Sequence, residues 1–483
     1  MKKRFLIFGA VISMALSFNA CSSDDPVDPT DENPGQVPEV PEEPAAPGAL
    51  NLADYNNGTG VMMQAFYWDV EPRHEWWETI NEKIAGWADA GVNRIWIPPA
   101  SKGQSGGYSM GYDPSDYFDL GEYMQHGTLP TRFGTREELD DLIAEAHAND
   151  IEVIADIVLN HNSGGGLEWN PYREKDTYTL FDEEHGNASG KFNRDFENFY
   201  PNSTSQYDDG SLFYEETNLD HNQEYVQNWL WKADYSVANY YKNEVGFDGW
   251  RFDYVLGFES WVINEWMEAV GGFGVAELWD GNPDVLEDYI EETGISVFDF
   301  AAFYKMDEAF DRHNDLTILE RHMVWQNYPD KAVTFTANHD TEKDQNEDNN
   351  ISVGNKMKAY AFILTHPGYP TIFYSDYENE NFNEGLKQLM LINSSLATGD
   401  VEILYVDNDE YVMKRSGNGT NPGLILYINT SGNTKRRNIT TGWNNQKIMD
   451  YTYQTNYSPV TGDNGSVSIE APGNSYSVYS IMD

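Results

Sequence analysis

The sequence alternates short apolar runs with longer segments of helical periodicity, and this alternation limits the possible folds more than any other feature. A short apolar run bounded by polar residues is typical of a buried strand, and the segments Trp76–Ala90 and Glu137–Asn149 are expected to be helices. Strands that alternate with helices form βα units on a parallel sheet, and eight such runs predict an α/β fold closed as a (β/α)8 TIM barrel. The expected strands are Val61–Tyr67, Val92–Ile97, Ile151–Leu159, Phe247–Phe252, Phe273–Ala276, Ser296–Phe300, Ala332–Thr336 and Tyr369–Tyr374.

Two segments interrupt this alternation. Residues 162–222 are polar and rich in Gly and Asn, and they are too long for an ordinary loop, so we expect a small inserted domain after the third strand. After residue 400 the helical patterns stop, and short alternating strands separated by Gly and Asn turns predict an antiparallel β-sandwich domain over residues 400–483. The barrel would therefore comprise residues 52–161 and 223–399.

The N-terminal residues have the character of an export signal. Met1–Arg4 is basic and is followed by an apolar run over Phe5–Phe18 that is too short to span a bilayer. The small residue before Cys21 resembles a lipoprotein cleavage box, which predicts a signal peptide over residues 1–21 and lipidation of Cys21. The alternative is an ordinary secreted protein with an incidental cysteine.

The segment that follows the cysteine favours the lipoprotein hypothesis. Ser22–Gly48 contains seven prolines, eight acidic residues and no basic residue, so residues 22–51 are expected to form a disordered tether. The acidic pair Asp24 and Asp25 resembles export signals of surface-exposed lipoproteins in some Gram-negative bacteria. We therefore expect a chain that is lipid-anchored in the outer membrane and exposed at the cell surface.

Composition excludes several classes of partner. The chain has 80 acidic and 30 basic residues, a formal charge of −50, which argues against binding to nucleic acid or to an anionic membrane surface. A single cysteine excludes an intrachain disulfide and a cysteine-based zinc site. Aromatic residues make up 14% of the chain, which fits stacking on sugar rings as well as core packing. Four tryptophans could form a sugar platform or lie in the core, and the core position is favoured for each: Trp76, Trp77, Trp169 and Trp443.

Three expected strands end in a carboxylate. The stretch Gly246–Tyr254 ends its apolar pattern in Arg251 and Asp253, and such a pair is costly to bury unless the charges compensate each other or perform chemistry. A structural ion pair is the first alternative. Two later strands deliver Glu277 and Asp340, and the C-terminal ends of barrel strands meet on one face. Three convergent acids therefore favour an active site.

Convergent carboxylates suit glycoside hydrolysis, which needs a nucleophile and an acid/base. Arg251 precedes Asp253 by two residues, so the two side chains point the same way and the cation can pair with that carboxylate. Glu277 lies among apolar and aromatic neighbours, which are expected to raise its pKa toward that of a proton donor. His339 can donate a hydrogen bond to a sugar hydroxyl.

Short motifs in this chain follow the order in which they occur in the α-amylase family of retaining glycoside hydrolases, and residues 52–483 resemble that family. Two further segments, Met110–Glu122 and Gly127–Thr135, also resemble it. No single motif is specific, whereas the set is. The four central motifs are Asp156–His161, Gly249–Asp253, Ala276–Trp279 and Asn338–Asp340.

The resemblance implies a role for each residue at a matching position. Asp253 would be the nucleophile, Glu277 the general acid/base, and Asp340 the residue that binds and distorts the sugar ring. The residues expected to contact the sugar are Tyr112, His161, Arg251, His339 and Trp279.

The resemblance also implies one calcium ion (Ca2+), which prefers oxygen ligands. Asn160 would supply a side-chain oxygen and Gly257 a backbone carbonyl, although Asn160 by itself fits a strand-end turn equally well. Asn218 would be a neutral ligand where relatives carry a charged one, so weaker calcium binding is expected unless another carboxylate compensates. The candidates for that compensation are Asp208, Asp209 and Asp220.

A second departure follows the nucleophile, where Leu256 and Gly257 replace the family's usual Lys-His or Lys-Gly. The missing lysine removes a contact to sugars on the leaving-group side, which affects the expected product pattern. The leading hypothesis is a monomeric, retaining, endo-acting α-amylase that hydrolyses α-1,4-glucosidic bonds in starch, glycogen or maltooligosaccharides. The alternatives are a maltooligosaccharide-releasing or transglycosylating relative and a catalytically silent glucan-binding surface lipoprotein.

Overall fold

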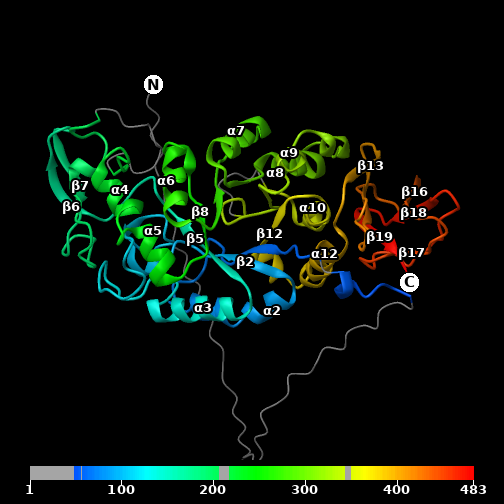
Figure 1. Ribbon diagram of the computed structural model, residues 1–483, viewed down its shortest axis with the longest axis horizontal. Coiled ribbons are helices and arrows are strands. Elements are labelled where there is room, and N and C mark those ends of the chain that lie inside the picture. Colours follow the sequence, from blue (N-terminus) through cyan, green and yellow to red (C-terminus); the bar gives the residue numbers. More distant parts are fainter. Residues whose placement is uncertain (1–47, 56, 206–216, 343–349, 483) are drawn as a thin grey trace, which may run out of the picture. The chain divides into compact units, whose positions relative to one another are not determined.

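Eight parallel strands close into a barrel at the centre of the fold (Figure 1). The computed structural model describes residues 48–55, 57–205, 217–342 and 350–482. The strand order is β1-β12-β11-β10-β9-β8-β5-β2, which confirms the predicted (β/α)8 barrel. The barrel strands are β1 (Val61–Gln64), β2 (Val92–Trp96), β5 (Glu152–Ile157), β8 (Gly249–Phe252), β9 (Phe273–Ala276), β10 (Ser296–Phe298), β11 (Ala332–Thr334) and β12 (Tyr369–Phe373).

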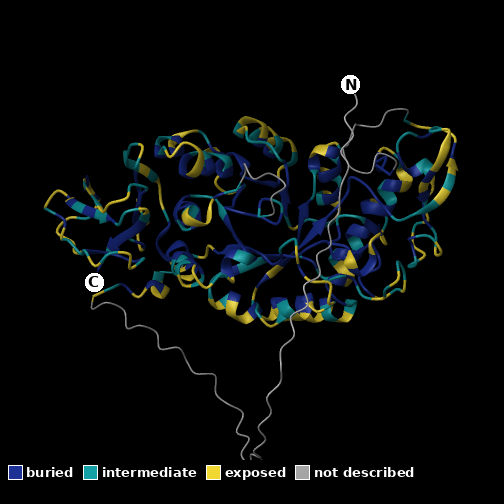
Figure 2. Ribbon diagram, turned by 180° about the vertical axis from the view of Figure 1, so that it is seen from behind, coloured by how far each residue is buried: buried dark blue, intermediate teal, exposed yellow. Residues whose placement is uncertain are grey.

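Helices follow the barrel strands along the chain and leave their outer faces exposed, whereas the barrel strands are mostly buried (Figure 2). The helices are α1 (Trp76–Asn81), α2 (Ile84–Asp89), α3 (Arg136–Ala148), α4 (Glu224–Gln227), α5 (Val237–Tyr240), α6 (Trp261–Val270), α7 (Pro283–Thr293), α8 (Phe300–Asp307), α9 (Val324–Asn327), α10 (Val353–Thr365), α11 (Tyr374–Tyr377) and α12 (Asn383–Leu396). Short 3-10 and π segments are η1 (Leu52–Tyr55), η2 (Gly106–Tyr108), η3 (Phe196–Asn198), η4 (Asn228–Lys232), η5 (Tyr241–Val245), η6 (Val255–Gly257), η7 (Glu308–Arg312) and η8 (Leu316–Glu320).

The single helix predicted over Trp76–Ala90 is wrong, because the structure divides it into α1 and α2. The backbone N–H of Lys83 donates to the carbonyl of Ile80, three residues earlier, and this tighter turn interrupts the α-helical pattern. Trp77, Ile80 and Ile84 remain buried across the break. The apolar periodicity therefore identified the buried face correctly but not the continuity of the helix.

The polar segment between β5 and α4 contains a two-stranded antiparallel sheet, β6 (Gly166–Asn170) with β7 (Lys175–Leu180). Arg194 joins this inserted segment to the loop before α3. Its buried guanidinium donates to the side-chain oxygen of Asn162 at 3.1 Å and to the backbone carbonyl of Ser115 at 3.0 Å. One buried cation thus bonds to both segments.

The C-terminal residues form an antiparallel β domain, as predicted. A five-stranded sheet of order β13-β14-β15-β19-β17 and the pair β16–β18 enclose a second core that includes Val412, Ile425 and Ile469. The strands are β13 (Val401–Val406), β14 (Glu410–Arg415), β15 (Leu424–Asn429), β16 (Lys435–Thr440), β17 (Ile448–Asp450), β18 (Ser466–Ala471) and β19 (Ser475–Ile481).

The predicted signal peptide, Cys21 and most of the tether lie outside the described residues. Within the described part of the chain, no helix has both the length and the apolar character needed to cross a bilayer.

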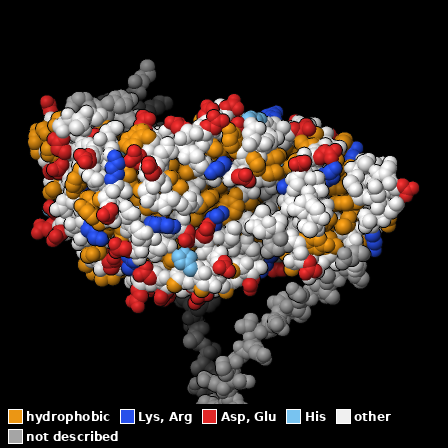
Figure 3. Space-filling view, in the orientation of Figure 1, with side chains coloured by type: hydrophobic (Ala, Val, Ile, Leu, Met, Phe, Trp, Pro, Cys, Tyr) orange, Lys and Arg blue, Asp and Glu red, His pale blue; other side chains and the backbone are white. Residues whose placement is uncertain are grey.

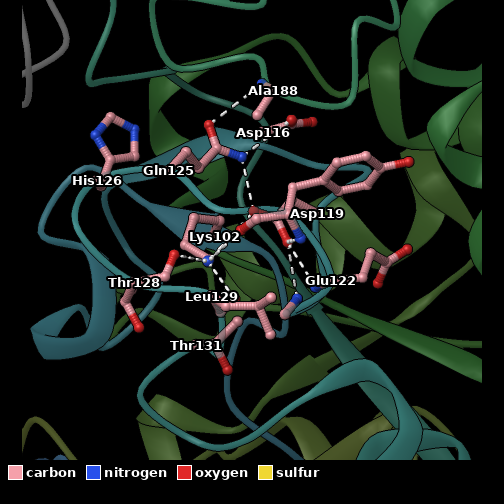
Figure 4. A network of polar contacts seen from close by, with 12 residues as sticks. Lys102, Asp116, Asp119, Glu122, Gln125, His126, Thr128, Leu129, Thr131 and Ala188 are labelled. Atoms are coloured by element: carbon pink, nitrogen blue, oxygen red, sulfur yellow. Dashed lines mark hydrogen bonds and ion pairs between the residues drawn. The ribbon is translucent and has the colours of Figure 1, made fainter.

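Lys102 organises the long loop between β2 and α3. It lies in β3 (Lys102–Gly103), which pairs with β4 (Pro114–Asp116), and its side chain is fully buried. The ammonium group lies 3.3 Å from Oδ2 of Asp119 and donates to the carbonyls of Tyr123, Thr128 and Leu129 at 3.2, 3.2 and 2.6 Å (Figure 4). Four oxygens thus surround one internal cation.

The same network reaches the inserted segment. Asp116, which pairs with Lys102 between β3 and β4 and lies beside Gln125 in Figure 4, accepts hydrogen bonds from the backbone N–H and the hydroxyl of Ser189, both at 2.8 Å. Gln125 donates to Asp119 at 2.7 Å and accepts from the N–H of Ala188 at 3.3 Å. The loop that carries Tyr112 is therefore fixed from its inner side by buried polar contacts.

We predict that Lys102→Met lowers the free energy of unfolding by about 3–5 kcal/mol, because it leaves a buried carboxylate and three carbonyls without their cation. Chemical denaturation or the shift in melting temperature measures this loss. Lys83→Met is the matched control, since Lys83 pairs with Glu378 at 2.8 Å near the surface, and its loss is expected to cost at most about 1 kcal/mol. Equal losses in the two variants would contradict the structural role of Lys102.

Candidate active site

Two of the three predicted acids lie directly after the ends of neighbouring, paired strands. Asp253 directly follows β8 and Glu277 directly follows β9, and the last residues of these strands, Phe252 and Ala276, are paired. Asp340 lies further along the loop that follows β11 rather than at the strand end itself. All three acids belong to the C-terminal face of the barrel, where barrel enzymes place their chemistry.

Arg251 brings carboxylates from three strands together. Its side chain is fully buried, and Nη1 donates to Oδ1 of Asp156 and to Oδ1 of Asp253, both at 2.7 Å. Nη2 donates to Oε1 of Glu277 at 2.5 Å, and the backbone N–H of Tyr254 donates to Oε2 of Glu277 at 3.0 Å. The guanidinium therefore fixes the nucleophile candidate and the acid/base candidate in one plane of hydrogen bonds.

This cluster has more negative groups than its one cation can neutralise. Burial raises the pKa of Glu277 to about 8, against the opposing effect of Arg251, and the charges of Asp253 and Asp340 raise it further. Burial also raises the pKa of Asp156 to about 6. Glu277 therefore holds a proton at neutral pH, which is the state that a general acid requires.

Side-chain exposure shows that Asp253 and Asp340 can contact a ligand, whereas Asp156 cannot. The side chains of Asp253 and Asp340 are 13% and 27% exposed, whereas that of Asp156 is fully buried. Asp156 accepts from the hydroxyl of Tyr112 at 2.8 Å and from Nε1 of Trp96 at 3.0 Å. Asp156 is thus a positioning residue for Arg251 and Tyr112.

His339 connects Asp340 to the barrel interior. Nε2 of Gln64 lies 2.9 Å from Nδ1 of His339, and Nε2 of His339 lies 3.4 Å from Oδ2 of Asp340. With the Gln64 amide nitrogen as donor, the neutral imidazole accepts at Nδ1 and carries its proton on Nε2, toward Asp340. Burial lowers the pKa of His339 well below its usual value, and the nearby Arg251 lowers it further.

Three aromatic rings form a set of nearly parallel planes beside the acids. The ring of Tyr112 lies 5.3 Å from that of His339 and 5.9 Å from that of Trp68, with interplanar angles of 6° and 10°. Trp68 and Tyr112 are only partly buried. Such a surface suits the flat, apolar face of a sugar ring.

Two predicted sugar contacts have protein partners. Nε2 of His161 lies 2.9 Å from the backbone carbonyl of Tyr112, so His161 supports the loop that carries the tyrosine. Trp279 donates from Nε1 to the hydroxyl of Tyr304 at 2.6 Å, and its ring packs 4.7 Å from that of Phe300. Among the predicted contact residues, Arg251 and Tyr112 bond to the acids directly, His339 lies beside Asp340, and His161 bonds to the backbone of Tyr112.

The sequence identified Asp156 only as part of a motif and did not predict that it positions Arg251 and Tyr112. Asp156 lies in β5, and the criterion of a carboxylate near a strand end, applied to the other three acids, would have identified it. Trp68, Trp96 and Gln64 carry no comparable sequence signal, because only the closed barrel brings them to the cluster.

The residues predicted to hold calcium are close to one another. His161 and Asn218 form an isolated β-bridge, and the N–H of Leu219 donates to the carbonyl of Asn160 at 3.1 Å. A methyl group on Gly257 would lie 2.2 Å from Oδ1 of Asn160, so only glycine allows this approach. Gly257 thus lies against the side-chain oxygen of Asn160, and Asn218 belongs to the segment that bonds to the end of the same strand.

The carboxylates expected to strengthen the calcium site either bond elsewhere or lie outside the described residues. Asp220 accepts from the side chains of Asn202 at 2.8 Å and Thr204 at 3.0 Å, so it already serves the adjoining loop. Asp208 and Asp209 lie outside the described residues. Within the described ranges, no group of three or more His, Cys, Asp or Glu side chains is arranged to hold a metal ion.

The C-terminal domain matches the family model described as Alpha-amylase C-terminal over residues 424–480. The α-amylase of Bacillus licheniformis is 32% identical over 66% of this chain and 71% of its own length. The cytoplasmic α-amylase of Escherichia coli is 29% identical over 88% of this chain and 99% of its own. The α-amylase of Geobacillus thermoleovorans, solved with acarbose, has a TM-score of 0.64 at 20% identity, with 88% of this chain and 98% of that one covered.

We predict that Asp253→Asn lowers the pKa of Glu277 below its value of about 8, because a negative charge that disfavours ionisation is removed. Isotope-edited infrared titration of the Glu277 carboxyl measures this pKa without any turnover. Asp288→Asn on the exposed side of α7 is the control and is expected to leave the titration unchanged. An unchanged or higher pKa in Asp253→Asn would contradict the charge balance described above.

Proposed function

The chain belongs to the α-amylase family and is an α-amylase-type glycoside hydrolase, and we propose that it hydrolyses internal α-1,4-glucosidic bonds of starch-like glucans with retention of configuration. The observation that carries this proposal is the shared guanidinium of Arg251. It holds Asp253 and Glu277 side by side while Glu277 keeps a proton. Retaining enzymes need two such carboxyl groups close together in opposite protonation states.

In the first step, the Asp253 carboxylate attacks the anomeric carbon and forms a glycosyl ester. The bond from that carbon to the leaving sugar breaks, and Glu277 gives its proton to the leaving oxygen. In the second step, the Glu277 carboxylate takes a proton from water, and the water oxygen displaces Asp253 as a carboxylate. Each step inverts the anomeric carbon, so the product keeps the α configuration.

The remaining groups of the cluster suit substrate placement. Asp340 and Tyr112 are beside the reacting groups and can bind the sugar ring on the non-reducing side of the bond, with Tyr112 against its apolar face. On the leaving-group side, the side chain of Leu256 is 56% exposed in η6. An apolar side chain there replaces the ammonium group expected from the family, so we propose weaker hydrogen bonding to the leaving sugars and a broad range of product lengths.

We propose that Asn160, Asn218 and the carbonyl of Gly257 hold one calcium ion. Their support is the close approach of Gly257 to Asn160 and the β-bridge that places Asn218 beside the same strand end. When bound, the ion would tie the inserted segment to β5 and η6. Its contribution would be to order these loops, and no proton or electron transfer depends on it.

We also propose that Cys21 carries a lipid that anchors the chain in the outer membrane, with the barrel at the cell surface. The support is the basic start, the apolar run and the proline-rich acidic segment that follows the cysteine. The proposed substrate is a polymer, which is consistent with a hydrolase outside the cell. In its mature form the protein is proposed to be a monomer.

For the reaction, we predict that Glu277→Gln lowers kcat by about 10²–10⁴-fold, because the proton donor is lost. In the native chain, kcat/KM is expected to fall tenfold per pH unit above about pH 8, since the acid must be protonated. Glu268→Gln, on the exposed side of α6, is the matched control.

Anomeric NMR and chromatography of products from amylose test the stereochemistry and the mode of attack. Early α products of mixed length support a retaining endo-acting enzyme. A single product length would instead assign a maltooligosaccharide-releasing enzyme, and β products would contradict the proposed mechanism.

For the metal, we predict that calcium raises the melting temperature relative to a chelator, because it binds the folded chain preferentially. Asn160→Ala should abolish this increment, and Asn218→Asp should enlarge it by adding a charged ligand. Asn243→Asp adds the same charge at an exposed position of η5 and serves as the control. No calcium-dependent increment in the native chain would overturn the proposed site.

For the anchor, we predict that Cys21→Ser moves the protein from the membrane fraction to the soluble fraction of the cells that produce it. Protease treatment of intact cells then tests which side the barrel faces. A native chain that is already soluble would contradict lipidation, and a protected membrane-bound chain would contradict exposure at the surface.

A further inference from the structure

The hairpin β6–β7 has its apolar and polar faces reversed. Leu167, Trp169 and Tyr178 point outward, with 56%, 59% and 57% of their surface exposed. The opposite face holds Thr177 and Thr179, which are fully buried. A half-buried antiparallel sheet normally turns its apolar residues inward and its polar ones to water, so this pattern is the opposite of what burial favours.

The inward face is a specific polar ladder rather than a slipped register. The hydroxyls of Thr177 and Thr179 lie 2.8 Å apart, and Thr179 donates to Oε1 of Glu168 at 2.7 Å. The same glutamate oxygen accepts from the backbone N–H of Phe196 at 2.7 Å. The pairing is irregular between Gly166 and Glu168, and from Glu168 to Asn170 these bonds favour the register that turns the aromatic rings outward.

Trp169 is exceptional within this chain. All 14 tryptophans lie in the described residues, and Trp169 is the one that is exposed. Trp76 and Trp77 belong to the core, and Trp443 packs against the C-terminal one. The sequence-based preference for a core position is therefore wrong for Trp169.

The exposed residues are arranged as one surface. Trp169 pairs with Asp176 across the ladder, and Tyr178 lies two residues further on the same face, so Trp169 and Tyr178 are diagonal neighbours within reach of aromatic side chains. Leu167 lies on the same face of β6. We call Leu167, Trp169 and Tyr178 the hairpin patch. Figure 3 shows hydrophobic side chains next to carboxylates at the end of the molecule where Figure 1 draws this hairpin.

We propose that the hairpin patch is a second glucan-binding site, separate from the acid cluster, at which a remote part of the polymer stacks on Trp169 and Tyr178. The proposal rests on the proposed function, because the ligand is the polymer that the active site cleaves. Exposed apolar patches in soluble proteins mark binding surfaces. Aromatic rings on a paired ribbon offer large flat faces with few rotatable bonds, so stacking costs little side-chain freedom.

The chemistry around the patch favours a neutral polyol over other occupants. Asp176 shares the outward face, and its carboxylate accepts hydrogen bonds, which sugar hydroxyls donate. A chain with a formal charge of −50 repels anionic lipids and nucleic acids. β6 begins five residues after His161, so one continuous segment joins the patch to the active-site face.

The experiment uses the full chain with Glu277→Gln, so that binding is measured without hydrolysis. Trp169→Thr with Tyr178→Thr removes both rings and keeps a β-branched residue on each strand. Adsorption to insoluble starch granules is expected to weaken about tenfold. The single variant Trp169→Tyr keeps an aromatic ring at this position and the native Tyr178, so it should retain most of the adsorption of the parent chain. In the active chain, the double variant should keep kcat/KM on a short maltooligosaccharide and lose activity on granules.

The matched control is Tyr453→Asn, which removes a tyrosine of 55% exposure in the C-terminal domain. Asparagine tolerates the φ of 57° at that position, and adsorption should be unchanged. Unaltered adsorption in the double variant would overturn the proposal. The proposal would also be overturned if the double variant adsorbed normally but lost a concentration-dependent self-association that sedimentation detects in the parent chain. That result would assign the patch to contact with a second copy of the chain. A chain without any hydrolytic activity would contradict the proposed function but would leave this binding measurement valid.

Discussion

The buried guanidinium of Arg251 is the interaction on which the functional part of the structure depends. A cation inside a barrel is tolerable only with compensating charges and hydrogen-bond acceptors, and Asp156 in β5, Asp253 after β8 and Glu277 after β9 supply the carboxyl oxygens that surround it. The compensation is unequal, with three acids for one base. Burial, together with the charges of Asp253 and Asp340, raises the pKa of Glu277 to about 8, so the arrangement that keeps Arg251 buried also keeps a proton on one of the acids that it holds.

Buried cations recur as the device that fixes long loops to the barrel. Lys102 gathers the loop between β2 and α3 around its ammonium group, and Arg194 bonds to that loop and to the inserted segment. Because backbone carbonyls inside a protein need donors, a single cation with several donor hydrogens can fix a segment that has no regular structure. Tyr112 therefore reaches Asp156 from a loop that is held at several points along its inner side.

The inserted segment serves two surfaces. Its inner edge lies beside the catalytic face through the bridge between His161 and Asn218, and its outer hairpin presents Trp169 and Tyr178 to solvent. The apolar residues of the hairpin can face outward because its inner face is held by the hydrogen bond that Thr179 donates to Glu168 rather than by an apolar core. A polymer that occupies both surfaces would be held by one protein segment at two points, which raises its effective concentration at the acids.

The sequence by itself determined the barrel, the C-terminal β domain and the placement of three acids on one face of the barrel, because strand periodicity and strand-end charges are local patterns. It did not determine the break between α1 and α2, where a single tightened turn leaves the apolar pattern intact. It also could not show that Asp156 is shared by Arg251, Tyr112 and Trp96, or that Trp169 is exposed. Contacts between distant segments and the inward face of a hairpin depend on closure and register, so only the tertiary structure decided them.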